Sequence, residues 1–103
     1  MVYGDRYEGF WENDYKNGKG IYYWANGDMY DGIWQSGVRT GHGIMHYATS
    51  KDRYEGLWLN NNRSGKGILY YANGDRYEGL WLLGVRSGHG VMYYAISGYR
   101  YEG

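Results

Sequence analysis

The sequence predicts an all-β fold, an elongated and open-ended single-layer antiparallel β-meander of tandem β-hairpins. Two features of its 103 residues carry this prediction: abundant glycine with many aromatic residues, and a short motif that returns along the chain. Each of the 19 glycines would destabilise a helix interior, by about 1 kcal/mol per site. A content of 20% aromatic residues without any proline is also unlike a disordered linker. Strands are therefore expected throughout.

The recurring motif is Tyr-X-Gly-X-Trp, and a Gly-X-Gly follows each of its first four tyrosines by eleven residues. The motif starts at Tyr7, Tyr30, Tyr54 and Tyr77 and begins again at Tyr101, in steps of 23, 24, 23 and 24 residues. Such a period indicates a repeat architecture. We expect one array over residues 1–103, with repeats at approximately 7–29, 30–53, 54–76 and 77–100 and partial repeats at 1–6 and 101–103.

The array is cut within a repeat at both ends, so we expect either an excerpt of a longer protein or a consensus-like design. Residues 3–6 resemble the end of an earlier turn, and the fifth motif stops at Gly103. Unpaired sheet edges invite association with another chain. Self-association or dimerisation is therefore one expectation for this protein.

Each repeat holds two strand-like runs, for example residues 5–12 and 18–25, joined by polar loops. Asn-Gly at positions 26–27 and 73–74 favours two-residue type I′ turns, in which both residues have φ > 0. Residues 96–98, Ile-Ser-Gly, fit a three-residue turn, whereas Thr-Ser-Lys at 49–51 lacks the glycine and predicts a weaker one. In the other loops, Asp14 and Asn61 replace a glycine but tolerate φ > 0, so those turns are expected to persist.

A two-residue turn at Asn26-Gly27 sets Tyr23 opposite Tyr30 and Lys19 opposite Trp34. Extended through the array, this register predicts three surfaces. The partner-binding aromatic face holds Tyr7, Trp11, Tyr23, Tyr30, Trp34, Tyr54, Trp58, Tyr70, Tyr77, Trp81 and Tyr93. The basic edge holds Lys16, Lys19, Arg39, His42, Arg63, Lys66, Arg86 and His89. The apolar second face holds Phe10, Ile33, Leu57 and Leu80, together with second-strand residues such as Tyr22, Met45 and Leu69.

The Tyr-X-Gly-X-Trp, Gly-X-Gly and Asn-Gly-Asp pattern resembles the MORN repeat, and the resemblance covers essentially the whole chain. Even copies also carry the family's additional glycine, at Gly37 and Gly84. A departure is the residue between the motif's glycine and tryptophan, commonly charged in the family and apolar here. The resemblance implies a cytoplasmic module that tethers cytoskeletal, ciliary or membrane-junction components through partner binding or self-assembly.

Composition and spacing argue against several other classes of protein. The chain has no cysteine for disulfides or thiolate chemistry, and its 11 basic and 11 acidic residues give zero net charge, so we expect no nucleic-acid partner. His42 and His46 are four residues apart on a predicted strand, about 13 Å and too far to share a metal ion. Asn17-Gly18-Lys19-Gly20 recurs without a following helix, unlike a phosphate loop. We expect no enzyme, no catalytic residue, no metal and no cofactor.

Three functions remain open from the sequence. The first is a protein-interaction scaffold that holds an extended or helical partner segment against the aromatic face, oriented by the bases. The second is peripheral attachment to anionic phospholipid headgroups through the basic edge. The third is a structural spacer or self-associating ribbon. Since both predicted faces are apolar and no helix is expected to cover either, the sequence favours binding.

Overall fold

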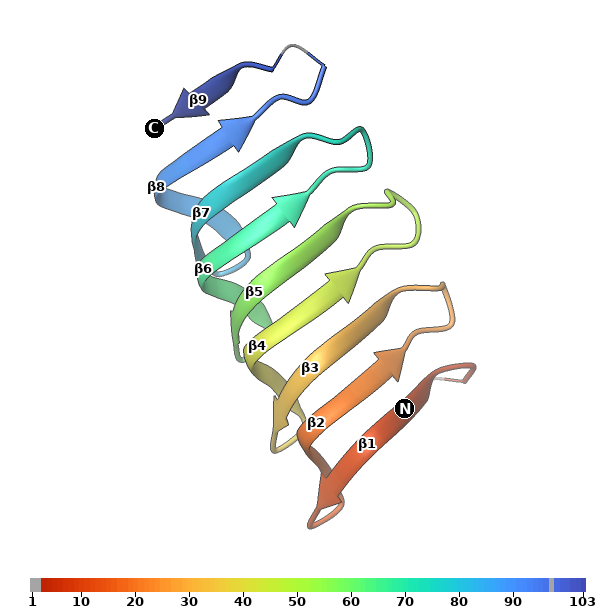
Figure 1. Cartoon of the computed structure of the whole chain (residues 1–103). Coiled ribbons are helices and arrows are strands. Elements are labelled where there is room, and N and C mark those ends of the chain that lie inside the picture. The colour runs from red at the N-terminus through yellow and green to blue at the C-terminus, as the bar shows by residue number, and fades with distance from the viewer. Residues whose placement is uncertain (1–2, 97) are drawn as a thin grey trace.

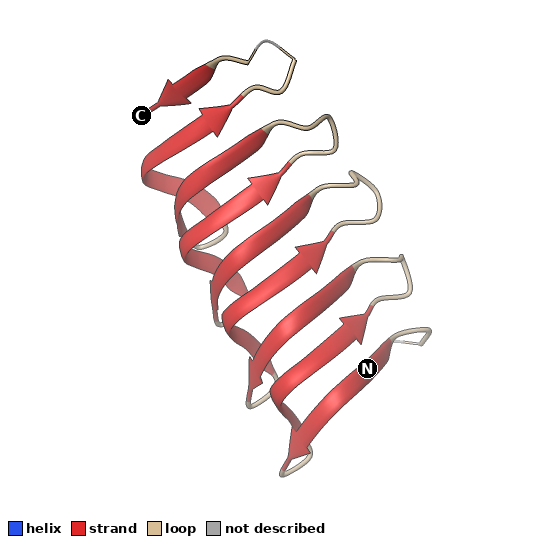
Figure 2. Cartoon of the chain, viewed as in Figure 1, coloured by secondary structure: helices blue, strands red, loops and turns tan. Residues whose placement is uncertain are grey.

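The computed structural model describes residues 3–96 and 98–103, which form nine strands and no helix (Figures 1 and 2). All nine lie in one antiparallel sheet in chain order. The strands are β1 (Arg6–Glu12), β2 (Tyr15–Tyr23), β3 (Met29–Gln35), β4 (Val38–His46), β5 (Arg53–Leu59), β6 (Asn62–Tyr70), β7 (Arg76–Leu82), β8 (Val85–Tyr93) and β9 (Arg100–Glu102). The predicted all-β, single-layer, open meander is confirmed.

The type I′ prediction for Asn26-Gly27 is wrong, because the hairpin between β2 and β3 is closed by Trp24 and Asp28, which enclose a loop of three residues. The Gly27 amide donates to the Trp24 carbonyl at 2.9 Å, and the Trp24 amide donates to the Asp28 carbonyl at 3.0 Å. Gly27 has φ 98°, while Asn26 keeps φ < 0 and accepts the Asp28 amide on its side chain at 2.9 Å. This is the three-residue hairpin with one left-handed glycine, and Tyr71 to Asp75 repeats it.

The third loop residue shifts the pairing by one position, and the predicted register is therefore wrong as well. Tyr22, not Tyr23, lies opposite Tyr30, and Gly18, not Lys19, lies opposite Trp34. Side chains alternate between the faces of a strand, so a shift of one residue moves every side chain of the second strand to the other face.

Two-residue turns with consecutive positive φ occur instead at the opposite ends of the strands. Asn13 and Asp14 have φ 50° and 67°, and Leu83 and Gly84 have φ 49° and 85°. The turn containing Asn61 is likewise formed, with φ 72° at that residue. The expectation that Asp14 and Asn61 would keep their turns is confirmed.

The longer step of the second repeat comes from its turn after the Gly-X-Gly. There the Lys51 amide donates to the Tyr47 carbonyl at 2.9 Å, which leaves one more residue in the loop than in the first repeat. Lys51 occupies the left-handed position with φ 66°, where glycine would be free of strain. The corresponding turn at Ile96-Ser97-Gly98 includes Ser97, which lies outside the described residues.

Every hairpin bends, which turns the sheet into a trough (Figure 1). A flat nine-residue strand would be about 30 Å long, but the Cα trace measures 48 × 25 × 17 Å. Between β1 and β2 the register shifts after Gly9, and the same bulge recurs between β3 and β4, β5 and β6, and β7 and β8. Bulges bend strands, and here they fold the two ends of each strand toward each other over one face of the open sheet.

Candidate interaction surfaces

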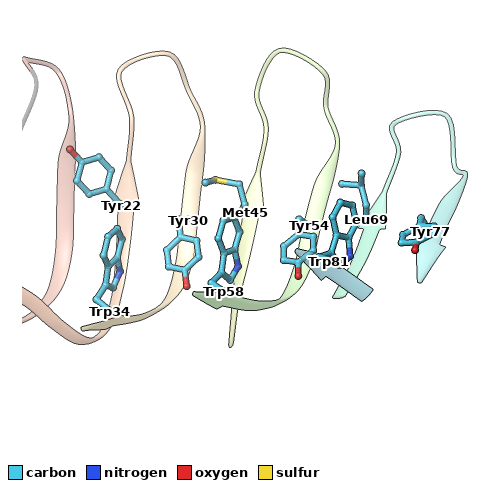
Figure 3. Close-up of a cluster of buried hydrophobic side chains, with 9 residues drawn as sticks. All are labelled: Tyr22, Tyr30, Trp34, Met45, Tyr54, Trp58, Leu69, Tyr77 and Trp81. Atoms are coloured by element: carbon cyan, nitrogen blue, oxygen red, sulfur yellow. The ribbon is translucent and has the colours of Figure 1, made fainter. Parts of the chain in front are cut away.

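The inner face of the trough is lined by a continuous ladder of rings (Figure 3). Tyrosine and tryptophan alternate, and successive rings meet edge to face with centroids 5.0–5.7 Å apart. In order the rings are Trp11, Tyr7, Trp34, Tyr30, Trp58, Tyr54, Trp81 and Tyr77. Such geometry contributes about 0.5–1.5 kcal/mol per pair beyond area burial. The ladder from Trp34 to Tyr77, together with Tyr22, Met45 and Leu69, forms the core of this protein.

Glycine pairs let each tyrosine lie flat across the strands. Tyr54 donates its hydroxyl to the Leu57 carbonyl at 2.9 Å, and its ring passes over Gly56 and Gly67, which face each other on β5 and β6. A Cβ atom at Gly67 would overlap this ring and its hydroxyl. The tryptophans anchor differently, since the indole of Trp58 donates to the Gly43 carbonyl at 3.2 Å.

The deep ladder rings are closed to solvent. Tyr30 and Tyr54 are 0% exposed, and Trp34, Trp58 and Trp81 are 4–5% exposed. Burial, the largest effect, raises the pKa of Tyr30 and of Tyr54 to about 12. A partner cannot touch these rings unless other side chains move first.

Half of the predicted basic edge covers the ring ladder from one side of the trough. These residues are Lys16, Arg39, Arg63 and Arg86, whose cationic groups lie over ladder rings. Arg39 places its guanidinium 4.8 Å from the Trp58 ring centroid and 5.5 Å from that of Trp24. In a flat sheet the backbones of Arg39 and Trp24 would lie about 20 Å apart along the strands. Their contact therefore shows directly that the two arms of the trough face each other. Burial lowers the pKa of Arg39.

These bases also connect neighbouring repeats. Arg39 donates from its amide to Oδ1 of Asn61 at 2.8 Å and from Nη2 to the Asn61 carbonyl at 3.2 Å. Arg63 donates from Nη2 to the carbonyl of Gly84 in the next repeat. In the first repeat, the Lys16 ammonium lies 5.2–5.9 Å from four ring centroids, those of Tyr7, Trp11, Tyr22 and Trp34.

The predicted basic edge does not form one surface. Lys16, Arg39, Arg63 and Arg86 lie on the inner face, each opposite a ladder tryptophan. Lys19, His42, Lys66 and His89 lie on the outer face and are exposed. The physical reason is the register, because Lys16 and Lys19 differ by an odd number of positions along the same strand.

The predicted aromatic face needs the same correction. Tyr23, Tyr70 and Tyr93 lie on the outer face, where arginine guanidinium groups cover their rings at 4.0–4.3 Å. Tyr22, Met45 and Leu69, predicted on the second face, belong instead to the buried inner core.

Phe10, Ile33, Leu57 and Leu80, the predicted apolar second face, lie on the outer face beside the exposed lysines and histidines. Phe10 is 68% exposed, and Leu57 and Leu80 are about 40% exposed. Charged groups are interspersed with them, so the outer face is mixed in character.

The sequence places a further row of aromatic residues, Trp24, Tyr47, Tyr71 and Tyr94, on the second face and does not single it out as a binding surface, but in the structure this row borders the inner core. Trp24, Tyr47 and Tyr71 pack against the buried core and are only half-buried, and Tyr94 is 41% exposed. We call these four the aromatic rim. The available signal was their recurrence at one position, directly before the alanine that opens each turn. A hollow of about 550 Å³ lies beside Tyr47 and Tyr71.

The turns next to the aromatic rim are stacked by an aspartate ladder. Asp28 accepts the backbone amide of Ala48 at 2.7 Å, and Asp52 accepts that of Ala72 at 2.9 Å. Asp75 holds Ala95 in the same way. Each turn is therefore fixed to the next, which keeps the rim residues in line.

Within the described residues, no helix is long and apolar enough to cross a membrane. Nor does that part of the chain hold a cluster of three or more His, Cys, Asp or Glu side chains fit for a metal ion.

The bent hairpins, the ring ladder and the aromatic rim together define an open-ended repeat protein of β-hairpins, whose trough is lined by aromatic rings. The family model of the MORN repeat matches residues 7–29, 30–50, 54–76 and 77–99. The chain therefore belongs to the MORN-repeat family, whose repeats generally form non-enzymatic modules for protein or membrane interaction. No curated protein matches the chain.

Proposed function

We propose that this protein is a non-enzymatic interaction module that binds a segment of another protein along the mouth of its trough. The main support is the regular arrangement of side chains along the open side of the trough, which we call its mouth. Each full repeat presents one aromatic side chain on one edge (lip) of the mouth and one base on the other. The aromatic rim is Trp24, Tyr47, Tyr71 and Tyr94, and the bases are Lys16, Arg39, Arg63 and Arg86.

The rim rather than the ladder makes the contact in this proposal. Aromatic side chains provide large contact areas at low entropic cost and dominate interface energies. Tyr47 and Tyr71 are only half-buried, whereas Tyr30 and Tyr54 are 0% exposed. The ladder serves as the rigid support that holds the rim in place.

The spacing of the rim suits an elongated ligand. Equivalent positions in adjacent repeats are two strands apart, about 10 Å. A partner segment lying across the strands meets one aromatic and one cation at each such step. Acidic and apolar side chains on that segment complement the lip of bases and the lip of rings.

The test uses peptides selected from a displayed random library for binding to the intact chain. Replacing Tyr47 and Tyr71 together by alanine should weaken the selected peptides by at least ten-fold, measured by titration calorimetry. The matched control replaces Tyr23 and Tyr93 on the outer face and should leave the affinity unchanged. Unchanged binding by the Tyr47/Tyr71 variant, with its fold intact by circular dichroism, would refute the rim as the site.

A membrane surface is the second candidate, favoured by one observation. Lys19 and Lys66 stand exposed on the outer face, in one row with His42 and His89. Each base near an anionic membrane contributes about 1 kcal/mol. Sedimentation with phosphoinositide-containing vesicles at about 0.15 M salt tests it. Binding no tighter than to neutral vesicles would remove this candidate.

A further inference from the structure

The outer face carries two parallel rows of opposite charge. A cation row contains Arg6, Arg53, Arg76 and Arg100, interleaved with Tyr23, Tyr70 and Tyr93, and Met29 and His46 take the corresponding places on β3 and β4. An acid row lies beside it, two positions away on every strand. It contains Glu8, Asp31, Glu55, Glu78 and Glu102, interleaved with Ile21, Ile44, Ile68 and Val91.

We propose that this face is a homodimer interface, in which two copies pack outer face to outer face about a twofold axis parallel to the array. The inference is independent of the trough and of its ligand. It follows from the order of the two rows and from their chemistry, both of which are set by the register of the sheet.

The cation row and the acid row are complementary to each other under that rotation. A twofold axis along the array brings the cation row of one copy over the acid row of the other. Arg53 then faces Glu55 of the second copy, and Tyr70 faces Ile68 of the second copy. A twofold axis along the strands would instead press acid row against acid row, which like-charge repulsion disfavours.

The polar groups of this face are incompletely paired within one chain. The Arg76 and Glu78 side chains bond at 3.0 Å yet remain 40% and 37% exposed, and Arg6 and Glu8 are more exposed still. Arg53 and Glu55 form no such pair among the described residues, and Nε of Arg53 is buried without a hydrogen-bond partner there. Glu55 is therefore available to an arginine from a second copy.

The apolar groups of the face also lack a covering layer. Ile68 and Tyr70 are only half-buried, because the described chain forms a single sheet whose inner side is already filled. The guanidinium groups lie over the tyrosine rings, with Cζ 4.2 Å from the ring centroid for Arg53 on Tyr70 and 4.0 Å for Arg76 on Tyr93. Apolar rows that lack a cover in this way suit packing against a second sheet at about 10 Å.

The size of the face sets the expected affinity. Nine strands span about 38 Å and two rows about 13 Å, which gives roughly 500 Å² from each copy and 1,000 Å² in all. That total lies at the lower end for specific interfaces. We therefore expect a dimer that forms at micromolar concentrations, with more dissociation as salt concentration rises.

Charge reversal in two complementary variants tests the arrangement by analytical ultracentrifugation. The acid-row variant is Glu55→Arg/Glu78→Arg, and the cation-row variant is Arg53→Glu/Arg76→Glu. Each alone should dimerise at least ten-fold more weakly than the wild type. An equimolar mixture should form a heterodimer, because each row then meets its opposite, and the combined four-substitution variant should recover a homodimer.

Three results would overturn the proposal. One is a wild-type protein that is monomeric at about 0.5 mM. Another is a pair of folded variants that stay apart when mixed. The third is association beyond a dimer that charge reversal does not alter, which would indicate edge-to-edge pairing through β1 and β9. If a reversed variant fails to fold, Glu55→Gln/Glu78→Gln replaces it and should weaken the dimer several-fold. The inner-face control Tyr47→Ala should leave dimerisation unchanged.

Discussion

Replacing Gly67 by alanine tests whether the tyrosine lying across the glycine pair holds the trough together. An alanine Cβ would stand 2.5 Å from Cε1 of Tyr54 and closer still to the end of the ring. Carbon atoms prefer about 3.5–4.0 Å, so the ring must retreat by about 1 Å or more. Tyr54 has no room for this movement, because it is 0% exposed and wedged between Trp58 and Trp81 at 5.2 and 5.4 Å.

The expected cost follows from the contacts that the ring would lose. Two edge-to-face pairs contribute about 0.5–1.5 kcal/mol each, and the hydrogen bond from Tyr54 to the Leu57 carbonyl adds about 1 kcal/mol. Gly67→Ala should thus destabilise the protein by about 3 kcal/mol. Stability for a domain of this size is about 5–15 kcal/mol, so the loss is readily measured by urea unfolding monitored by tryptophan fluorescence.

A double-mutant cycle separates this clash from any unfavourable effect of alanine at position 67 that does not depend on Tyr54. With Tyr54→Leu in the background, the side chain no longer reaches across Gly67. Alanine should then be neutral or stabilise the strand by about 0.5–1 kcal/mol, since glycine is unfavourable within strands. An equal cost of Gly67→Ala in both backgrounds, or a cost below about 1 kcal/mol in the wild type, would refute this account of the core.

Three further predictions concern turns and pH. Leu83→Asn should raise the free energy of unfolding by about 1 kcal/mol, measured by thermal melting, because Leu83 has φ 49° in an exposed turn where asparagine is tolerated. Lys51→Gly should stabilise by about 1 kcal/mol in urea titrations, since φ is 66° there; no gain would contradict strain at that turn. Burial is the largest cause that raises the pKa of Tyr22, Tyr30 and Tyr54 from 10.0 to about 12. Their neutral forms favour folding fully below pH 10, so stability should fall as pH rises from 10 to 12, by roughly 1 kcal/mol per pH unit for each of Tyr30 and Tyr54 and by less for Tyr22; constant stability across that range, with tyrosinate formation followed by absorbance, would contradict it.

The array, its strands and its alternating step were predictable because they depend on composition and repetition. Tyr-X-Gly-X-Trp returns often enough to identify the repeat without any structure, and the 24-residue step correctly located an extra residue in the turn that ends at Lys51. The tolerance of Asp14 and Asn61 for positive φ also follows from residue type alone. These are local properties of the chain.

The register was not predictable from the turn sequence, because contacts between repeats decide it. Asn-Gly is the usual signal for a two-residue turn. Here the side chain of Asn26 accepts the Asp28 amide, and Asp5 of the preceding turn accepts the Ala25 amide at 2.8 Å. Those two bonds fix a three-residue loop. Because the predicted loop was one residue too short, the side chains of the second strand of each repeat, including those of Lys19 and Tyr23, were assigned to the wrong face.

The bend explains why a single sheet can have a core, and it also separates structural positions from variable ones. The ladder tyrosines and tryptophans and the paired glycines recur in all four repeats, and each fills space that the next repeat needs. Outer positions instead change between copies, as in Lys19 against His42 and Phe10 against Ile33. Substitution there leaves the ladder intact, so repeats can differ in what they bind without losing the fold. Differences between repeats in the proposed contacts are therefore expected mainly on the outer face, whereas the rim keeps an aromatic residue in every copy.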